Sequence, residues 1–277
     1  MRSALLIAAK ELRDDFRNRW IVAVAALFAA LSLGIAYFGG AVAGKVGFTS
    51  FPATLASLTT LGAFLIPLIG LLIAYDMVAG EVEGATLLLM LSYPLSRMQW
   101  LAGKLAGHCG ATTVATLAGF GLAVVAMQAV EPQARTLAAW LALGNFVASA
   151  ALLGACFIAF GCLISVLTDN KSRAAGIALL VWIASVVLFD LCLLALLVVT
   201  GGDRVEQQLF PYLLLGNPID VFRLINLSHL GNGAGNDLFL GMTAAHAYGL
   251  AELYGVLLGW VAAPAAAALL VFKRKEI

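Results

Sequence analysis

Six long apolar stretches constrain this sequence more than any other feature. They cover approximately residues 20–42, 55–79, 99–127, 137–167, 174–200 and 250–272. The hydrocarbon core of a bilayer is about 30 Å thick, so a helix rising 1.5 Å per residue needs roughly 20 apolar residues to cross it. Only helices and closed barrels satisfy the backbone in lipid, and these stretches lack the alternation of barrel strands. We therefore predict an all-α membrane protein with six transmembrane helices.

Composition excludes a soluble globular protein. Hydrophobic residues make up 62% of the 277 residues, charged residues make up 11%, and the mean hydropathy is +1.00. Soluble domains are about 45–50% apolar and about 25% charged, so the surplus apolar surface must face lipid. Nothing in the net charge of +1 suggests a nucleic-acid surface. The four cysteines form no CxxC pair and lie inside apolar stretches, which is typical of packing residues: Cys109, Cys156, Cys162 and Cys192.

The first apolar stretch is expected to remain as a membrane anchor. A charged, amphipathic lead over residues 1–19 precedes it. The stretch 20–42 is longer than the roughly 7–15 residue core of a cleavable signal peptide. We therefore count it as the first span.

Lys and Arg are distributed unequally between the two sides that six spans define. One side carries only Lys45, Arg135, Arg204 and Arg223, and the other carries the remaining twelve of the 16. The positive-inside rule places the twelve, and with them both termini, in the cytoplasm. The twelve are Arg2, Lys10, Arg13, Arg17, Arg19, Arg97, Lys104, Lys171, Arg173, Lys273, Arg274 and Lys275.

The longest connection, residues 201–249, is predicted to lie outside. Apolar runs broken by prolines indicate two short helices or re-entrant pieces within 208–227, before the sixth span.

No repeat of 20–50 residues is found, which disfavours an internally duplicated transporter.

A phosphate-binding loop is suggested by the spacing of Gly39–Val46, but we reject it. The run GGAVAGKV lacks the Ser or Thr that holds magnesium, and it follows a membrane helix rather than a strand. No catalytic constellation stands out elsewhere. The chain is therefore not expected to be an enzyme or to hydrolyse nucleotide by itself.

The connection between the second and third spans has the densest set of polar residues. A short amphipathic helix there would either bind a cytoplasmic partner or rest on lipid headgroups, and spacing alone leaves both open. The residues that mark this connection are Asp76, Glu81, Glu83, Pro94 and Arg97.

Three motifs resemble those of type-2 ABC-transporter permeases. The first is the lead Ala9-Lys-Glu-Leu-Arg13 to Arg19-Trp20, which is similar to the elbow helix of that family. The second, E-x-x-x-G-T/A-x5-S-x-P-x-S-R, occurs here as Glu81, Gly84-Ala-Thr86, Ser92, Pro94, Ser96 and Arg97. The third is Asn217-Pro-Ile-Asp-Val-Phe-Arg223 before the last span. The resemblance covers essentially the whole chain, residues 1–277, as a single transmembrane permease domain.

The resemblance implies a multi-pass protein of the bacterial inner membrane. It implies a homodimer bound to two copies of a cytoplasmic ABC ATPase, with ATP and magnesium on that ATPase and no cofactor on this chain. It also implies a periplasmic partner and a role in maturation of nitrous oxide reductase, by exporting a sulfur species or driving copper handover. The coupling helix that receives the ATPase would carry Glu81, Glu83, Gly84, Pro94 and Arg97.

Two alternatives remain open at this point. One is an ABC exporter of another cargo, such as a polysaccharide, a drug or a component of haem maturation. The other is a secondary transporter that uses intramembrane carboxylates and needs no ATPase. An ionisable group at a helix centre costs roughly 2.5–3.5 kcal/mol on insertion scales, so each one needs an explanation. The candidates are Asp190, His108, Asp76 and Glu252.

For Asp190 we favour a buried structural or gating role over substrate contact, and for His108 a hydrogen-bonded packing role.

His229, Met242 and His246 are possible Cu(I) ligands in the outer segment, but their loose spacing does not predict a metal site. Two GxxxG pairs, Gly103/Gly107 and Gly255/Gly259, favour close helix packing.

Overall fold

The computed structural model describes residues 2–17, 19–38, 50–87, 96–130, 136–200, 204–227 and 248–275, and every regular element in them is helical. The first two helices are α1 (Arg2–Arg17) and α2 (Trp20–Phe38). They meet at an angle of 62°, and Arg19 between them has a left-handed backbone with φ of 56°. The helix α1 covers the lead for which we expected an elbow.

The central part of the chain contributes the longest helices. These are α3 (Phe51–Ala74), the short α4 (Ala79–Glu83), α6 (Arg97–Val130) and α7 (Leu137–Leu167). Local signals place their ends: a proline lies in the first turn of α3, and the Thr136 side chain accepts from the Ala139 N–H to cap α7.

The last third of the chain is more broken than its apolar pattern predicts. The expected fifth span is built from α8 (Lys171–Ile183), a π-helical segment η3 (Ala184–Leu188) and α9 (Phe189–Thr200). Then follow α10 (Arg204–Leu214), α11 (Pro218–Leu227) and α12 (Leu250–Arg274). Two short helices thus precede the last long one.

Among the described residues, four helical stretches are long and apolar enough to cross a membrane. They are Phe51–Glu83, Leu137–Leu167, Lys171–Val199 and Leu250–Arg274. The bent pair α1–α2 makes a fifth if it is counted as one span, whereas α6 is not in the set despite its 34 residues. The count of six spans stays a prediction.

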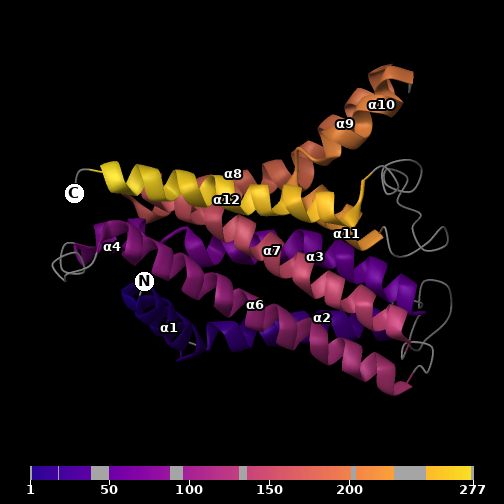
Figure 1. The fold of residues 1–277 in the computed structure, drawn as a ribbon, viewed down its shortest axis with the longest axis horizontal. Coiled ribbons are helices and arrows are strands. Elements are labelled where there is room, and N and C mark those ends of the chain that lie inside the picture. The colour runs from indigo at the N-terminus through magenta and orange to yellow at the C-terminus, as the bar shows by residue number, and fades with distance from the viewer. Residues whose placement is uncertain are drawn as a thin grey trace.

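Helix α7 lies at the centre of the bundle (Figure 1). It packs against α3, α6, α11 and α12, and its buried face includes Phe146, Leu153 and Phe157. Helices α1 and α2 lie along α6 on one side, and α12 lies on the other side of α7.

Glycines on α6 allow this close packing. A Cβ built on Gly107 would lie 2.7 Å from the Glu11 Cβ of α1, and one built on Gly119 would lie 2.4 Å from the Phe28 Cβ of α2. The Gly103/Gly107 pair therefore allows α1 of the same chain to pack closely against α6. A Cβ on Gly255 or Gly259 of α12, by contrast, would meet nothing within 4 Å.

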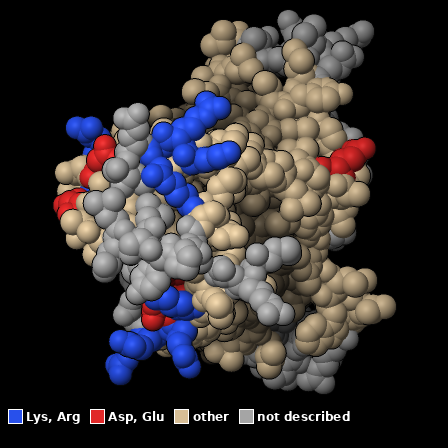
Figure 2. All heavy atoms as spheres, turned by 60° about the vertical axis from the view of Figure 1, so that its left-hand side comes forward, with Lys and Arg blue, Asp and Glu red and all other residues tan. Residues whose placement is uncertain are grey.

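The two ends of the bundle differ in chemistry. Both termini, α1 and α4 lie at one end, which we call the charged end (Figure 1). Lys and Arg side chains gather on the face that this end presents (Figure 2). We call the region of η3, α9, α10 and α11 the far end. There α9 and α10 project away from the other helices as an arm (Figure 1).

Candidate functional site

The charged end holds four of the predicted coupling residues, Glu81, Glu83, Gly84 and Arg97, and Glu81 is more enclosed than Glu83. Lys104 of α6 donates from Nζ to Glu81 Oε1 at 2.6 Å and to the Met77 carbonyl at 3.1 Å. The Lys104 side chain is 9% exposed, and its Nζ lies 4.8 Å from the centre of the Trp100 ring. These contacts offset the cost of burying an ammonium group. They fasten α4 to α6.

Both ends of α4 are fixed as well. At its start, the Ser165 hydroxyl of α7 accepts from the Val78 and Ala79 N–H groups, both at 2.9 Å. At its end, the Thr86 N–H donates to the Glu81 carbonyl at 3.0 Å, and Ala85 has a left-handed φ of 53°. This is the geometry of a Schellman cap, in which the left-handed position usually holds glycine. Here Gly84 lies one residue earlier, at the end of the helix.

Helix α8 is tied to the same region at its first residue. Glu83 Oε2 accepts from the Lys171 N–H at 2.8 Å, and Asp76 Oδ2 lies 2.8 Å from Lys171 Nζ. The Asn170 side chain accepts from the Arg173 N–H. A carboxylate at a helix N-terminus is favoured by the unpaired N–H groups and by the helix dipole. Glu83 therefore joins the end of α4 to the start of α8.

Arg97 and Lys275 join three further elements. Arg97, the first residue of α6, donates from Nη1 to the Lys275 carbonyl at 2.6 Å. Lys275 in turn donates from Nζ to the carbonyls of Val166 and Thr168 and pairs with Asp169 Oδ1 at 2.6 Å. The end of α12 is thus bound to the start of α6 and the end of α7.

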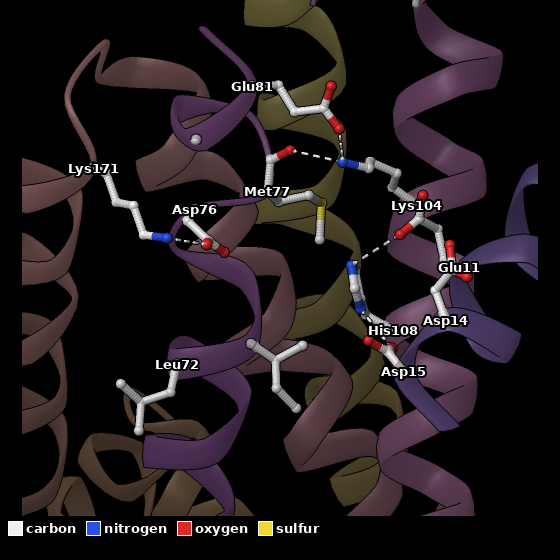
Figure 3. A pocket seen from close by; sticks show the side chains of 12 residues that line it. Glu11, Asp14, Asp15, Leu72, Asp76, Met77, Glu81, Lys104, His108 and Lys171 are labelled. Atoms are coloured by element: carbon white, nitrogen blue, oxygen red, sulfur yellow. Dashed lines mark hydrogen bonds and ion pairs between the residues drawn. The ribbon is translucent and has the colours of Figure 1, made fainter. Parts of the chain in front are cut away.

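A cavity of about 650 Å³ opens between α1, the α3–α4 connection, α6 and α8 (Figure 3). Five carboxylates, two lysines and one histidine line it, and each carboxylate has a cationic or histidine partner in the chain. Its wall consists of Glu11, Asp14, Asp15, Leu72, Ile73, Asp76, Met77, Gly80, Glu81, Lys104, His108 and Lys171.

His108 ties the first helix to this cavity. Its Nδ1 lies 2.8 Å from Asp15 Oδ2, and its Nε2 lies 3.9 Å from Glu11 Oε2; both carboxylates belong to α1. His108 is buried. The structure thus places it in a hydrogen bond between two helices.

Two other polar residues singled out from the sequence lie away from the charged end. Asp190, in the first turn of α9, pairs with Arg223 Nη1 of α11 at 2.8 Å. Glu252 accepts from the Gly249 N–H at 3.1 Å and so caps α12. The structure therefore does not bring Asp190, Asp76 and Glu252 together into one charged path.

Some predicted residues lie outside the described part of the chain. These are Pro94 of the coupling segment and the possible soft metal ligands His229, Met242 and His246. Within the described ranges, no group of three or more His, Cys, Asp or Glu residues is arranged to hold a metal ion.

Sequence reasoning missed Lys104, Ser165 and Lys171 as partners in this region. Their partners lie 23, 86 to 87 and 88 residues away along the chain. The available signal was a lysine and a serine inside apolar helices, because each needs a polar partner when it is buried.

Comparisons with known proteins agree with this architecture. The model of the ABC-2 family transporter proteins matches residues 5–277. The chain is 48% identical over 271 residues to the "Probable ABC transporter permease protein NosY" of Pseudomonas aeruginosa, covering 98% of each chain. It is 46% identical over 270 residues to the protein of the same name from Stutzerimonas stutzeri, covering 97% of each.

Proposed function

The chain belongs to the ABC-2 transporter family as the permease subunit of an ABC transporter, and from this premise we propose that it serves maturation of periplasmic nitrous oxide reductase. In this role it moves a sulfur species or drives copper handover for copper–sulfide centre assembly. Its relatives over nearly the full length are named NosY permeases, and its motifs resemble that branch of the family. The proposal leaves nucleotide chemistry, with ATP and magnesium, to a separate ATPase subunit.

The proposed topology has six spans with both termini in the cytoplasm of a bacterial inner membrane. The residues predicted to lie on the cytoplasmic side occur at the start of α6, the start of α8, the end of α12 and along α1. Contacts between Arg97 and Lys275, and between Lys171 and Asp76, join three of these regions at one end. The positive-inside rule then makes the charged end cytoplasmic.

The single observation that carries the coupling mechanism is a connected polar network. Glu81 links α4 to Lys104 of α6, Glu83 links it to the start of α8, and Ser165 links it to α7. A force applied to α4 would therefore reach three long helices through short polar contacts. We propose that the ATPase docks on the connection between α4 and α6, and that this network transmits its motion.

The proposed assembly is a homodimer with two ATPase subunits and a periplasmic partner. Apolar side chains on α8 and α9, such as Leu180, Val198 and Val199, are exposed in the single chain and require lipid or another protein around them. A cargo path between two copies of the chain would fit the family premise.

Copurification of the tagged chain from its native membrane, followed by mass spectrometry, tests this function. We expect one ATPase subunit per permease and a periplasmic protein in the same preparation. A chain that purifies alone and transports in liposomes without ATP would instead support a secondary transporter. A copurified ATPase with partners unrelated to nitrous oxide reductase would support an exporter of another cargo.

Glu81→Gln and Glu83→Gln test the network within that complex. Both substitutions keep side-chain size while removing the charge that Lys104 or the α8 N-terminus meets. We expect ATP hydrolysis to become uncoupled from transport while membrane insertion is unchanged. Glu252→Gln, at the start of α12 and away from the charged end, is the matched control. Full coupling in both test variants would show that α4 does not transmit the motion.

A further inference from the structure

The chain bends at the π-helical segment η3, between α8 and α9, at the far end (Figure 1). Such segments widen the helix and leave backbone groups without their usual partners, and they often mark functional sites. Asn217 donates from Nδ2 to the Ser185 carbonyl within η3 at 2.8 Å. Its Oδ1 accepts from the Ile219 N–H and caps α11. One side chain thus holds the bend and starts the helix beside it.

Arg223 of α11 makes a second contact, at Asp190 in the first turn of α9 just beyond the bend. Its Nη1 donates to Asp190 Oδ2 at 2.8 Å and to Asp220 Oδ1 at 3.0 Å. The two carboxylates differ in surroundings: the Asp190 side chain is 40% exposed, and that of Asp220 is 2% exposed. One guanidinium therefore serves one exposed and one buried carboxylate.

Asp220 is incompletely paired for a buried ion. Its Oδ2 is buried and has no hydrogen-bond partner among the residues that the structure describes. Burial, together with the charge of Asp190, raises the pKa of Asp220 to about 7 although Arg223 and the Asn217 side chain oppose the shift. A buried carboxylate with one free oxygen is a group that readily holds a proton.

The elements packed around α11 add little charge to this cluster. Helix α3 contributes no titratable side chain, and those of α7 are Cys156 and Cys162. At this end of α12 the titratable side chains are Glu252, which caps its own helix, and Tyr254, which donates to the Asn145 carbonyl. Among the described side chains, Asp190 and Arg223 therefore dominate the electrostatics of Asp220.

We propose that Asp220 is a proton-binding site that controls how firmly α11 holds the α9–α10 arm. With a proton on Asp220, Arg223 pairs with Asp190 alone and the arm is latched beside the bend. Without that proton, Asp220 is a buried anion that must keep its ion pair with Arg223, because an unpaired buried charge is very costly. Asp190 is the more exposed of the two carboxylates, so Asp190 is the partner that leaves.

The direction of the effect follows from this competition. Raising the pH through about 7 removes the proton from Asp220 and loosens the arm, and lowering the pH latches it. This switch acts at the opposite end from the coupling network, and it operates in the full chain whether or not an ATPase is bound.

Spin-label distance measurements on the full chain in lipid nanodiscs test the switch. Labels on Val199→Cys of the arm and Leu141→Cys of α7 occupy exposed positions, and Cys192→Ser removes the exposed native thiol. Double electron–electron resonance at pH 6 should give one narrow distance distribution. At pH 8 we expect a broader distribution with a longer mean, and a midpoint near pH 7.

Three variants decide the assignment. Asp220→Asn mimics the protonated group and should keep the narrow distribution at both pH values, whereas Asp190→Asn should be broad at both. Glu252→Gln, a nearby carboxylate outside the cluster, should respond to pH as the parent does. The proposal is overturned if the parent distribution does not change with pH, if Asp220→Asn still responds, or if Asp190→Asn remains narrow at pH 6.

Discussion

The charged end and the far end are held together in opposite ways. At the charged end, every carboxylate in the described part of the chain has a cation, a histidine or a backbone N–H as partner. Several of these contacts join separate elements: α1 to α6, α4 to α6 and α8, and the end of α12 to the connection between α7 and α8. At the far end, the arm of α9 and α10 exposes apolar side chains, and Asn217 and Arg223 join the bend to α11.

This difference suggests a division of labour. A region crossed by many short polar contacts moves as one body, so a displacement of α4 would also displace the long helices bonded to it. A helix with a π-helical bend and few cross-links can change its angle at small cost. The comparison predicts that damage at the charged end reduces stability and coupling together, whereas damage at the far end changes motion with less loss of stability.

Lys104→Met should produce the largest effect. It leaves the Glu81 carboxylate without its ammonium partner, and breaking a buried pair from one side costs about 3–5 kcal/mol. Because Glu81 is partly exposed, we expect about 3 kcal/mol less stability and a clear fall in the thermal unfolding midpoint. ATPase stimulation in the assembled complex should also be lost.

Lys10→Met is the control for that substitution. Lys10, with a side chain that is 57% exposed, pairs with Glu11 and Asp14 within α1, and pairs made by an exposed lysine contribute about 0–1 kcal/mol. If the two methionine variants had the same midpoint, the buried pair would not hold the charged end together and the comparison would fail there.

Gly107→Ala should have the next largest effect. The added Cβ would lie 2.7 Å from the Glu11 Cβ and 3.0 Å from the Ala8 carbonyl, so α1 must shift from α6. Overpacking of this kind costs about 1–3 kcal/mol. Hydrogen exchange in α1 should accelerate. Gly121→Ala in the same helix meets nothing within 4 Å and should be neutral or slightly stabilising. Equal rates of hydrogen exchange in α1 of both variants would contradict close packing of α1 against α6.

The sequence predicts the helices better than their connections. Apolar length and hydropathy depend on local composition, and the structure has a helix with the bounds predicted for the fourth stretch, Leu137–Leu167. The residues Ala184–Leu188 contain neither Gly nor Pro, so nothing in ASVVL distinguishes a π-helical bend from a straight helix. The contact made to this segment comes from a residue distant in sequence, Asn217 just before α11, which donates to the Ser185 carbonyl.

The candidate site shows the same limit. Glu81, Glu83 and Arg97 stand out because charges are rare in this chain, but their roles depend on partners distant in sequence. Arg97 finds the carbonyl of Lys275, 178 residues away. Asp190 likewise stands out as an intramembrane acid, whereas Arg223 becomes its partner only through the packing of α11. Local pattern identifies residues that need a partner but not which partner they find.

Asn217→Ala tests the far end with a smaller expected loss. It removes the donor to the Ser185 carbonyl and the cap of α11, which together should cost about 1–2 kcal/mol. Spin-label distances across the bend should broaden while ATPase coupling is kept. Asn217→Ser retains a capping oxygen but not the reach to Ser185, so it should broaden the distances with less loss of stability. A loss of coupling in either variant would show that the two ends are not separate.

Ala85→Gly should have the smallest effect of the four test substitutions, and unlike the other three it is expected to stabilise. Ala85 has a φ of 53°, where an L residue is strained by roughly 1–2 kcal/mol and glycine is not. Part of that gain is offset because glycine is more flexible when unfolded, so we expect an increase of about 0.5–1 kcal/mol in the free energy of unfolding. Ala79→Gly, at a helical position of α4, should instead destabilise by about 1 kcal/mol.

Thermal unfolding midpoints and ATPase stimulation, measured together on Ala85→Gly, show which feature of α4 transmits the motion. A rise in the midpoint with unchanged stimulation means that the polar contacts of Glu81 and Glu83 transmit the motion. A rise with reduced stimulation means that the strained turn itself keeps α4 stiff enough to transmit it.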